Sequence, residues 1–106
     1  MLIERTKAYI DTFNNKDINK LSDFFDQDIS LFDPANPLGV FGKDNVLRII
    51  RELFTKDISF VSKNIFVDGN NTIIEFSLKI DNQYLKGVDI IEWQDSKIKT
   101  LRAYLY

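Results

Sequence analysis

Cysteine and histidine are both absent from this sequence of 106 residues. Their absence excludes thiol nucleophiles, Ser-His-Asp catalysis, His-ligated zinc and thiolate metal sites. We therefore expect no metal centre in this protein. Any acid–base chemistry must be carried by Asp, Glu, Lys or Tyr side chains.

Long apolar runs are absent as well. No segment is long enough to span a membrane, and the N-terminus enters an amphipathic pattern without the apolar stretch of a signal peptide. We therefore expect a cytoplasmic protein with no membrane contact, and the lack of cysteine agrees with a reducing compartment. A basic stripe is also missing, since the net charge is −2 and acids and bases are interspersed. We expect no nucleic-acid partner, because a phosphate backbone would find little to bind.

The composition that remains is that of one globular domain. Hydrophobic residues make up 44% and charged residues 28% of the chain. The length suits a single domain over residues 1–106. Aromatic residues are unevenly represented, with nine Phe and four Tyr against one Trp. That many rings can fill a core or line a pocket.

Apolar residues recur at helical spacing in three segments of the first half. The stripes are Leu2, Thr6, Tyr9, Ile10 and Phe13; Ile18, Leu21, Phe24 and Phe25; and Val46, Ile49, Ile50, Leu53 and Phe54. The first stripe breaks at residues 14–17, where Asp17 is placed to cap the second helix. The third helix is predicted to begin at about Lys43.

The rest of the chain predicts strands and turns. Residues 29–32 are too few for a helix and predict a short strand, followed by an irregular loop with Pro34, Pro37, Gly39 and Gly42. After Lys56 the apolar period changes to two, which predicts strands at residues 59–67, 72–80, 84–94 and 97–106. Three helices and hairpin-linked strands predict an α+β fold with the helices on one face of the sheet.

One predicted strand carries an anomaly. Its apolar face consists of Leu85, Gly87, Ile91 and Trp93, and Asp89 lies among them. A carboxyl group there must find a partner, face a pocket, or keep its proton because burial raises its pKa. Two interpretations stay open: a structural ion pair with a cation such as Arg102, or a functional site. Alternation places Arg102 on the opposite face, so we expect no such pair.

Two other residues are candidates for chemistry. Asp33 precedes Pro34 at the start of the loop, where a side chain can face a cavity mouth, although an Asp before Pro more often simply begins a turn. Tyr9 lies on the apolar stripe of the first helix, so its hydroxyl would need a hydrogen-bond partner. Taken alone, such a tyrosine is more often a core residue.

Together these residues resemble a known family. The similarity lies in Tyr9-Ile10, Asn14-Asn15-Lys16-Asp17, Phe24-Phe25, Asp33-Pro34, Gly42-Lys43, Gly87-Val88-Asp89-Ile90-Ile91-Glu92-Trp93, Lys97-Ile98 and Leu101-Arg102-Ala103-Tyr104. Over essentially its whole length the chain resembles the nuclear transport factor 2-like superfamily, and within it the SnoaL-like and ketosteroid isomerase-like branches. The resemblance implies three N-terminal helices packed in the concave face of a strongly curved, mainly antiparallel sheet, a cone-shaped, cystatin-like α+β barrel. It also implies a homodimer.

The resemblance further implies roles for three residues. Tyr9, Asp33 and Asp89 match the helix-one Tyr, the Asp before Pro and the penultimate-strand Asp of ketosteroid isomerases. By that match Asp33 would take a proton from carbon next to a carbonyl. Tyr9 and a neutral Asp89 would donate hydrogen bonds to the oxygen. The expected walls of the substrate pocket are Phe13, Ile50, Phe76, Ile91, Trp93, Leu101 and Ala103.

The chain also departs from relatives of this kind. Ile50 stands where ketosteroid isomerases often have a further, supporting Tyr. Members that dehydrate scytalone-type substrates depend on His, which is absent here. Members that open epoxides use an Asp-Arg-Asp arrangement, and none of Arg48, Arg51 and Arg102 can be placed between two acids from the sequence. Asp89 recurs in members with other activities, so it does not discriminate among them.

Three hypotheses for function follow, since this superfold hosts enzymes, ligand binders and assembly domains. The first is a small cofactor-free enzyme that isomerises, or otherwise moves a proton on, a compact apolar carbonyl substrate. It requires Tyr9, Asp33 and Asp89 to converge on one cavity. The second is a non-catalytic domain that binds an apolar ligand. The third is an assembly domain that dimerises through its outer sheet face, including Val88 and Ile90, and has a cavity filled by Phe. We favour the enzyme.

Overall fold

The three predicted helices are present in the computed structural model, which describes residues 1–106. They are α1 (Leu2–Asn14), α2 (Ile18–Ser22) and α3 (Lys43–Leu53). Asp17 caps α2 as predicted, because its carboxylate accepts a hydrogen bond from the backbone N–H of Lys20 at 3.1 Å. None of the helices is long and apolar enough to cross a membrane.

The second helix is shorter than the sequence pattern predicted. It ends at Ser22, and Phe25 already begins strand β1 (Phe25–Asp33). The backbone carbonyl of Phe24 accepts a hydrogen bond from the N–H of Ile98 at 2.7 Å, so this segment is tied to a strand. Phe25, Ile29 and Leu31 are all buried. The prediction that Phe24 and Phe25 belong to α2 was wrong, because adjacent apolar residues suit a buried strand as well as a helix.

The predicted irregular loop is also wrong over most of its length. Residues 36–41 form strand β2 (Asn36–Phe41), which pairs antiparallel with β1 through Ser30 and Phe41. Pro37 is compatible with this strand because β2 lies at the edge of the sheet, where one side needs no ladder hydrogen bonds. Gly39 has a φ of +96°, a conformation that favours glycine.

The remaining strands lie close to where their alternation placed them. They are β3 (Ile58–Asp68), β4 (Asn71–Ile80), β5 (Gln83–Gln94) and β6 (Lys97–Leu105). The sheet order is β2-β1-β6-β5-β4-β3. Only β1 and β6 pair in parallel, so the sheet is mainly antiparallel as expected. The two ends, β2 and β3, do not pair with each other, so the sheet curls without closing into a barrel.

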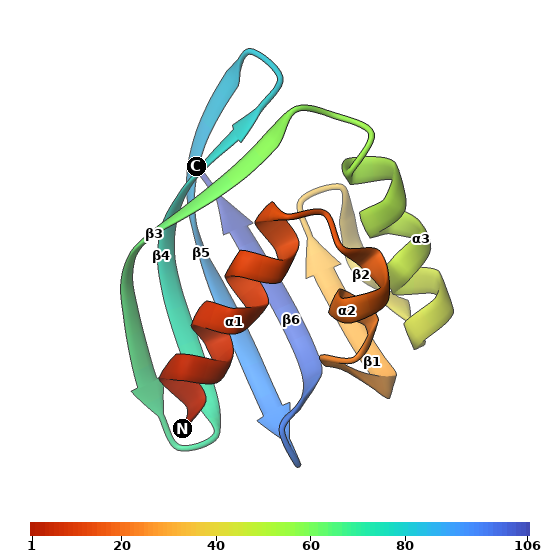
Figure 1. The fold of residues 1–106 in the computed structure, drawn as a ribbon, viewed down its shortest axis with the longest axis vertical. Helices are drawn as coiled ribbons and strands as arrows, with labels where there is room; N and C mark the ends of the chain where they lie inside the picture. The colour runs from red at the N-terminus through yellow and green to blue at the C-terminus, as the bar shows by residue number, and fades with distance from the viewer.

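The helices lie on one side of the curled sheet (Figure 1). Helix α1 crosses in front of the sheet, and α3 lies beside β1 and β2. The end of the sheet under the first turns of α1 is filled by Thr6, Thr72 and Trp93, all buried. Thr6 Oγ1 donates to Thr72 Oγ1 at 3.0 Å, and Trp93 Nε1 donates to the same oxygen at 2.9 Å. These bonds fasten α1 to β4 and β5.

Candidate active site

A cavity of about 290 Å³ lies between the helices and the other end of the sheet. Its volume is near the lower end of the range for small-molecule sites, roughly 300–1,000 Å³. Of the 19 residues that line it, 16 are hydrophobic. The cavity therefore offers an apolar ligand a water-poor environment with only a few polar contacts.

The three residues singled out from the sequence all line this one cavity. Tyr9 comes from α1, Asp33 from the end of β1, and Asp89 from the middle of β5. They are the only titratable side chains in the lining, which contains no Lys or Arg. The site is therefore acidic, with no cation of its own to neutralise a carboxylate.

Asp89 is the most unusual of the three. Its side chain is buried, with the residue only 7% exposed, and it lies between Ile74 on β4 and Ala103 on β6. Its Oδ1 atom is inaccessible to water and has no hydrogen-bond partner. Burial raises the pKa of Asp89 to about 7. Near neutral pH both its neutral and its ionised forms are therefore populated.

The alternative that Asp89 serves a structural ion pair does not hold. Arg102 is exposed on the opposite face, where it pairs in the sheet with Ile90 and Phe32. The ion pairs of the chain are Lys79–Asp57 and Lys99–Asp26, and neither includes Asp89. The alternation that placed Asp89 inward and Arg102 outward is therefore correct.

Tyr9 is held by aromatic packing. Its ring lies edge-on to Phe24, with 5.8 Å between the ring centroids, and 6.3 Å from the ring of Phe25. Burial raises the pKa of the Tyr9 phenol well above its usual value, and the charge of Asp89 raises it further. Tyr9 therefore keeps its proton at any physiological pH and can donate a hydrogen bond to a ligand.

Asp33 is half-buried at the β1–β2 turn and already has structural partners. Its Oδ1 atom accepts hydrogen bonds from the backbone N–H of Asn36 at 2.7 Å and from Asn36 Nδ2 at 3.0 Å. This is the turn-forming role that an Asp before Pro commonly has. Asp33 therefore both shapes the turn and lines the cavity, with Oδ2 as the oxygen that these two bonds leave free.

Five of the seven expected wall residues line the cavity: Phe13, Ile50, Phe76, Leu101 and Ala103. Ile91 and Trp93, which were also expected in the wall, are not among the residues that line this cavity. Both face inward as the alternation required, but they lie farther along β5 than Asp89, toward the end covered by α1. The indole N–H of Trp93 donates there to Thr72 Oγ1, and both side chains are buried.

Much of the cavity wall was missed from the sequence. The additional lining residues are Ile10, Leu31, Pro34, Ala35, Ile49, Leu53, Ile58, Phe60, Leu78, Ile80 and Leu105. Leu78 and Ile80 could have been predicted from the sequence, because the alternation that placed Phe76 inward continues to the end of β4. Phe60 stacks on Phe76 with 4.4 Å between the ring centroids, so β3 and β4 share one aromatic wall.

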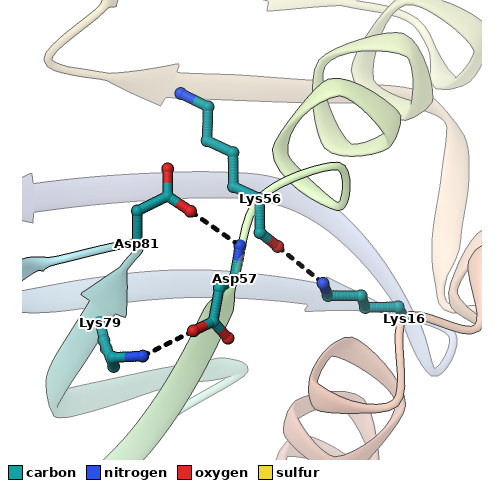
Figure 2. A network of polar contacts seen from close by, with 5 residues as sticks. All are labelled: Lys16, Lys56, Asp57, Lys79 and Asp81. Carbon is teal, nitrogen blue, oxygen red and sulfur yellow. Dashed lines mark hydrogen bonds and ion pairs between the residues drawn. The ribbon is translucent and has the colours of Figure 1, made fainter.

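A polar network lies next to two residues that line the cavity (Figure 2). Lys79 Nζ lies 2.6 Å from Asp57 Oδ2, Asp57 N donates to Asp81 Oδ1 at 3.0 Å, and Lys16 Nζ donates to the Lys56 carbonyl at 2.6 Å. Asp57 precedes Ile58 and Asp81 follows Ile80, and this isoleucine pair lines the cavity. The network therefore joins the start of β3 to the end of β4 beside the cavity wall.

The side chains of Tyr9, Asp33 and Asp89 suit acid–base chemistry, and they do not form a set of metal ligands. No group of three or more His, Cys, Asp or Glu side chains is placed to hold a metal ion. One carboxyl at the turn and two buried potential donors, Tyr9 and neutral Asp89, face the same apolar volume. A carbonyl oxygen placed between the donors could be stabilised as it gains negative charge.

Comparisons with known proteins place the chain among relatives of this fold. The model of the SnoaL-like domain matches residues 6–101. No curated protein matches the chain. An NTF2-like protein of unknown function from Cytophaga hutchinsonii superposes with a TM-score of 0.89 at 10% identity, covering 100% of this chain and 90% of that one.

Two further solved structures carry functional descriptions. A proposed ketosteroid isomerase from Kribbella flavida has a TM-score of 0.88 at 18% identity, covering 97% of this chain and 76% of that one. An LEH-like epoxide hydrolase from M. tuberculosis has a TM-score of 0.80 at 17% identity, covering 98% and 81%. At such identities the likeness shows a shared fold, and the different chemistries show that the fold alone does not select one.

Proposed function

The chain belongs to the SnoaL-like domain family, and we propose that it is a small cofactor-free enzyme that moves a proton within a compact apolar carbonyl substrate. The family fold hosts ketosteroid isomerases, polyketide cyclases and epoxide hydrolases, so the fold leaves the reaction open. The observation that supports isomerisation is the convergence of Tyr9, Asp33 and Asp89 on one apolar cavity.

In the proposed reaction Asp33 is the base. Its free carboxylate oxygen takes a proton from the carbon next to the carbonyl. The electron pair of that C–H bond forms a carbon–carbon double bond, and the π pair of the carbonyl moves onto its oxygen, which gives an enolate. Tyr9 and neutral Asp89 donate hydrogen bonds to this oxygen. The proton then returns from Asp33 to another carbon of the conjugated system, so the substrate is isomerised and the enzyme is restored.

Exchange of carbon-bound hydrogen tests the proton-transfer step without knowledge of the natural substrate. Cyclic ketones are incubated with the protein in D₂O, and loss of the hydrogens next to the carbonyl is followed by proton NMR. We expect Asp33→Asn to slow exchange by about 10²–10⁴-fold. Tyr9→Phe and Asp89→Asn should each slow it by roughly 10–10³-fold.

A matched acid-to-amide variant controls for altered charge. Asp68→Asn changes an exposed carboxyl at the end of β3, outside the cavity lining, and should leave exchange unchanged. Conjugation of compact β,γ-unsaturated ketones, followed by ultraviolet absorbance, then tests isomerisation itself. Wild-type protein that exchanges no ketone hydrogen above the rate of Asp33→Asn would refute the proposal.

The pH dependence gives a second test of the donor role. Asp89 can donate a hydrogen bond only while neutral, and burial raises its pKa to about 7. The exchange rate of wild-type protein should therefore fall as pH rises from about 6 to 8. The amide of Asp89→Asn donates at every pH in this range, so its slower reaction should show no such fall.

One observation favours the second candidate, a non-catalytic domain that binds an apolar ligand. Asp33 Oδ1 accepts two hydrogen bonds within the β1–β2 turn, so this side chain already has a structural role that requires no catalysis. In that case ketones would bind in the cavity, with binding measured by calorimetry, while their hydrogens would not exchange. The open cavity argues against the third hypothesis, which required Phe side chains to fill it.

A further inference from the structure

The cavity is lined by acidic side chains and no cation, and the proposed reaction gives the ionised form of Asp89 no role. Its titratable lining groups are Tyr9 from α1, Asp33 from the β1–β2 turn and Asp89 from β5; α3, β3, β4 and β6 contribute only apolar side chains. Asp89 is more than nine-tenths buried, and its Oδ1 atom has no hydrogen-bond partner. Oδ1 is fully enclosed, so a ligand in the cavity can reach only the other carboxyl oxygen, Oδ2. A buried carboxyl group without hydrogen bonds costs free energy, so a ligand that bonds to Oδ2 gains affinity.

Two kinds of ligand group can bond to Oδ2 of Asp89, one for each protonation state. Neutral Asp89 is a donor and suits a carbonyl oxygen. Ionised Asp89 is an acceptor in an apolar setting and lacks a counter-ion, because no Lys or Arg lines the cavity. A ligand ammonium group supplies both the missing charge and the missing donor, and such a charge-assisted hydrogen bond is roughly twice as strong as a neutral one.

We infer that the cavity binds compact apolar amines as ammonium ions, with the Asp89 carboxylate as their counter-ion, and excludes carboxylates of the same shape. The apolar wall holds the body of the amine, and Asp33 adds a second acidic side chain to the lining. A carboxylate ligand would meet two acidic groups and no cation. This binding does not depend on isomerase activity, since it requires only the cavity and the ionised side chain.

The affinity of the cavity for amines should depend on pH in a definite direction. Asp89 ionises as pH rises through about 7, while an aliphatic ammonium group keeps its proton to about pH 10, as lysine does. Affinity for an amine should therefore rise between about pH 6 and 8. Affinity for a neutral ketone, which needs the protonated acid, should fall over the same range. Tyr9 stays protonated throughout and adds no slope of its own.

The experiment compares three probes of one shape by isothermal titration calorimetry. They are 2-naphthylmethylamine, 2-naphthylmethanol and 2-naphthoate. At about pH 8 we expect wild-type protein to bind the amine on the order of tenfold more tightly than the alcohol, as hydrogen bonds to charged groups allow. The naphthoate should bind more weakly than the alcohol. At about pH 5.5 the preference for the amine should largely disappear.

Two matched variants test which carboxylate is the counter-ion of the bound ammonium group. In Asp89→Asn the amine and the alcohol should bind equally within about threefold at both pH values, whereas Asp33→Asn should retain most of the preference. Equal affinity of wild-type protein for amine and alcohol at pH 8 overturns the inference, and so does a preference lost in Asp33→Asn but kept in Asp89→Asn. If Asp89→Asn does not fold, the opposite pH trends of amine and ketone in wild-type protein decide the question. Failure of ketone hydrogen exchange, by contrast, would refute only the enzyme.

Discussion

Burial of the Asp89 carboxyl links the stability of the fold to pH. The folded protein holds the proton of Asp89 up to a pKa of about 7, whereas the unfolded chain loses it near 3.8. Between these values the folded state binds more protons, so the free energy of unfolding should fall as pH rises. The whole pKa difference between the folded and unfolded states corresponds to a change of roughly 4 kcal/mol in the free energy of unfolding.

Asp89→Asn is the variant that tests this linkage. The asparagine side chain cannot ionise, so at about pH 8 the variant should be more stable than wild-type protein by roughly 1–3 kcal/mol. The gain should be smaller than the free-energy change from the whole pKa difference, because a buried amide without partners is also costly. Urea unfolding at several pH values measures the effect. The difference between the two proteins should grow from pH 4 to 7 and then level off; a constant difference would contradict a raised pKa of Asp89.

The buried hydroxyl of Thr72 is a second residue whose removal should be costly. It accepts hydrogen bonds from Thr6 and from the indole N–H of Trp93, and all three side chains are buried. Thr72→Val keeps the shape but leaves two buried donors without a partner, at roughly 1–3 kcal/mol each. We expect a loss of about 2–4 kcal/mol in urea unfolding.

Thr12→Val is the matched control for that loss. Thr12 is also buried, but its hydroxyl only donates to the carbonyl of Ala8 one turn earlier in α1. Its replacement removes a donor from a carbonyl within the helix and leaves no buried side-chain donor unpaired, so the cost should be below about 1 kcal/mol. Similar losses in the two variants would mean that the Thr72 bonds do not fasten α1 to the sheet.

At the scale of elements, strong periodicity decided which parts could be predicted. The alternation of β4 and β5 identified both strands and placed Asp89 inward, and the stripe from Leu2 to Phe13 identified α1. Phe24 and Phe25 were misassigned because α2 contains only five residues, too few for a period to separate helix from strand. Strand β2 was missed because it contains Pro and Gly, which mark loops except at a sheet edge.

The candidate site shows the limit of alternation in another way. A period of two tells which face a side chain occupies, but it does not tell how far along the strand a cavity extends. Ile91 and Trp93 share the face of Asp89 and yet pack under α1, because the Thr6–Thr72–Trp93 contacts close that end. Only the three-dimensional placement of α1 over β4 and β5 distinguishes wall from core.

The polar network of Figure 2 leads to a prediction about the start of β3 and the end of β4. In Lys79→Met the ion pair with Asp57 is lost, while the fold should change little in stability because exposed pairs contribute little. The ends of β3 and β4 should open more often, so the backbone N–H groups of Asp57 and Asp81, which bond to Asp81 Oδ1 and the Asp57 carbonyl, should exchange faster in hydrogen-exchange NMR. Lys99→Met, which breaks the distant pair with Asp26, is the control and should leave these two rates unchanged.

At the scale of the whole molecule, the convex face of the sheet carries an outer apolar patch made of Phe66, Ile73, Val88, Ile90 and Tyr104. The strand register places Phe66 beside Ile73 and Ile73 beside Ile90, and Val88 beside Tyr104. Phe66 and Tyr104 are each more than half exposed. Monomeric proteins rarely expose a large contiguous apolar patch. We propose that this patch is the interface of a two-fold homodimer, packed sheet against sheet.

Ile90→Lys is the variant that tests the dimer, because Ile90 adjoins Ile73 within the outer apolar patch. In a two-fold interface the substitution introduces two lysines and buries their charge in an apolar contact. The dissociation constant of the dimer should therefore rise at least tenfold. Sedimentation velocity measures this shift. Leu38→Lys is the control, since Leu38 is 89% exposed on β2 at the far edge of the sheet and its replacement should leave the dimer intact. Wild-type protein that sediments only as a monomer at micromolar concentration would contradict the proposed dimer.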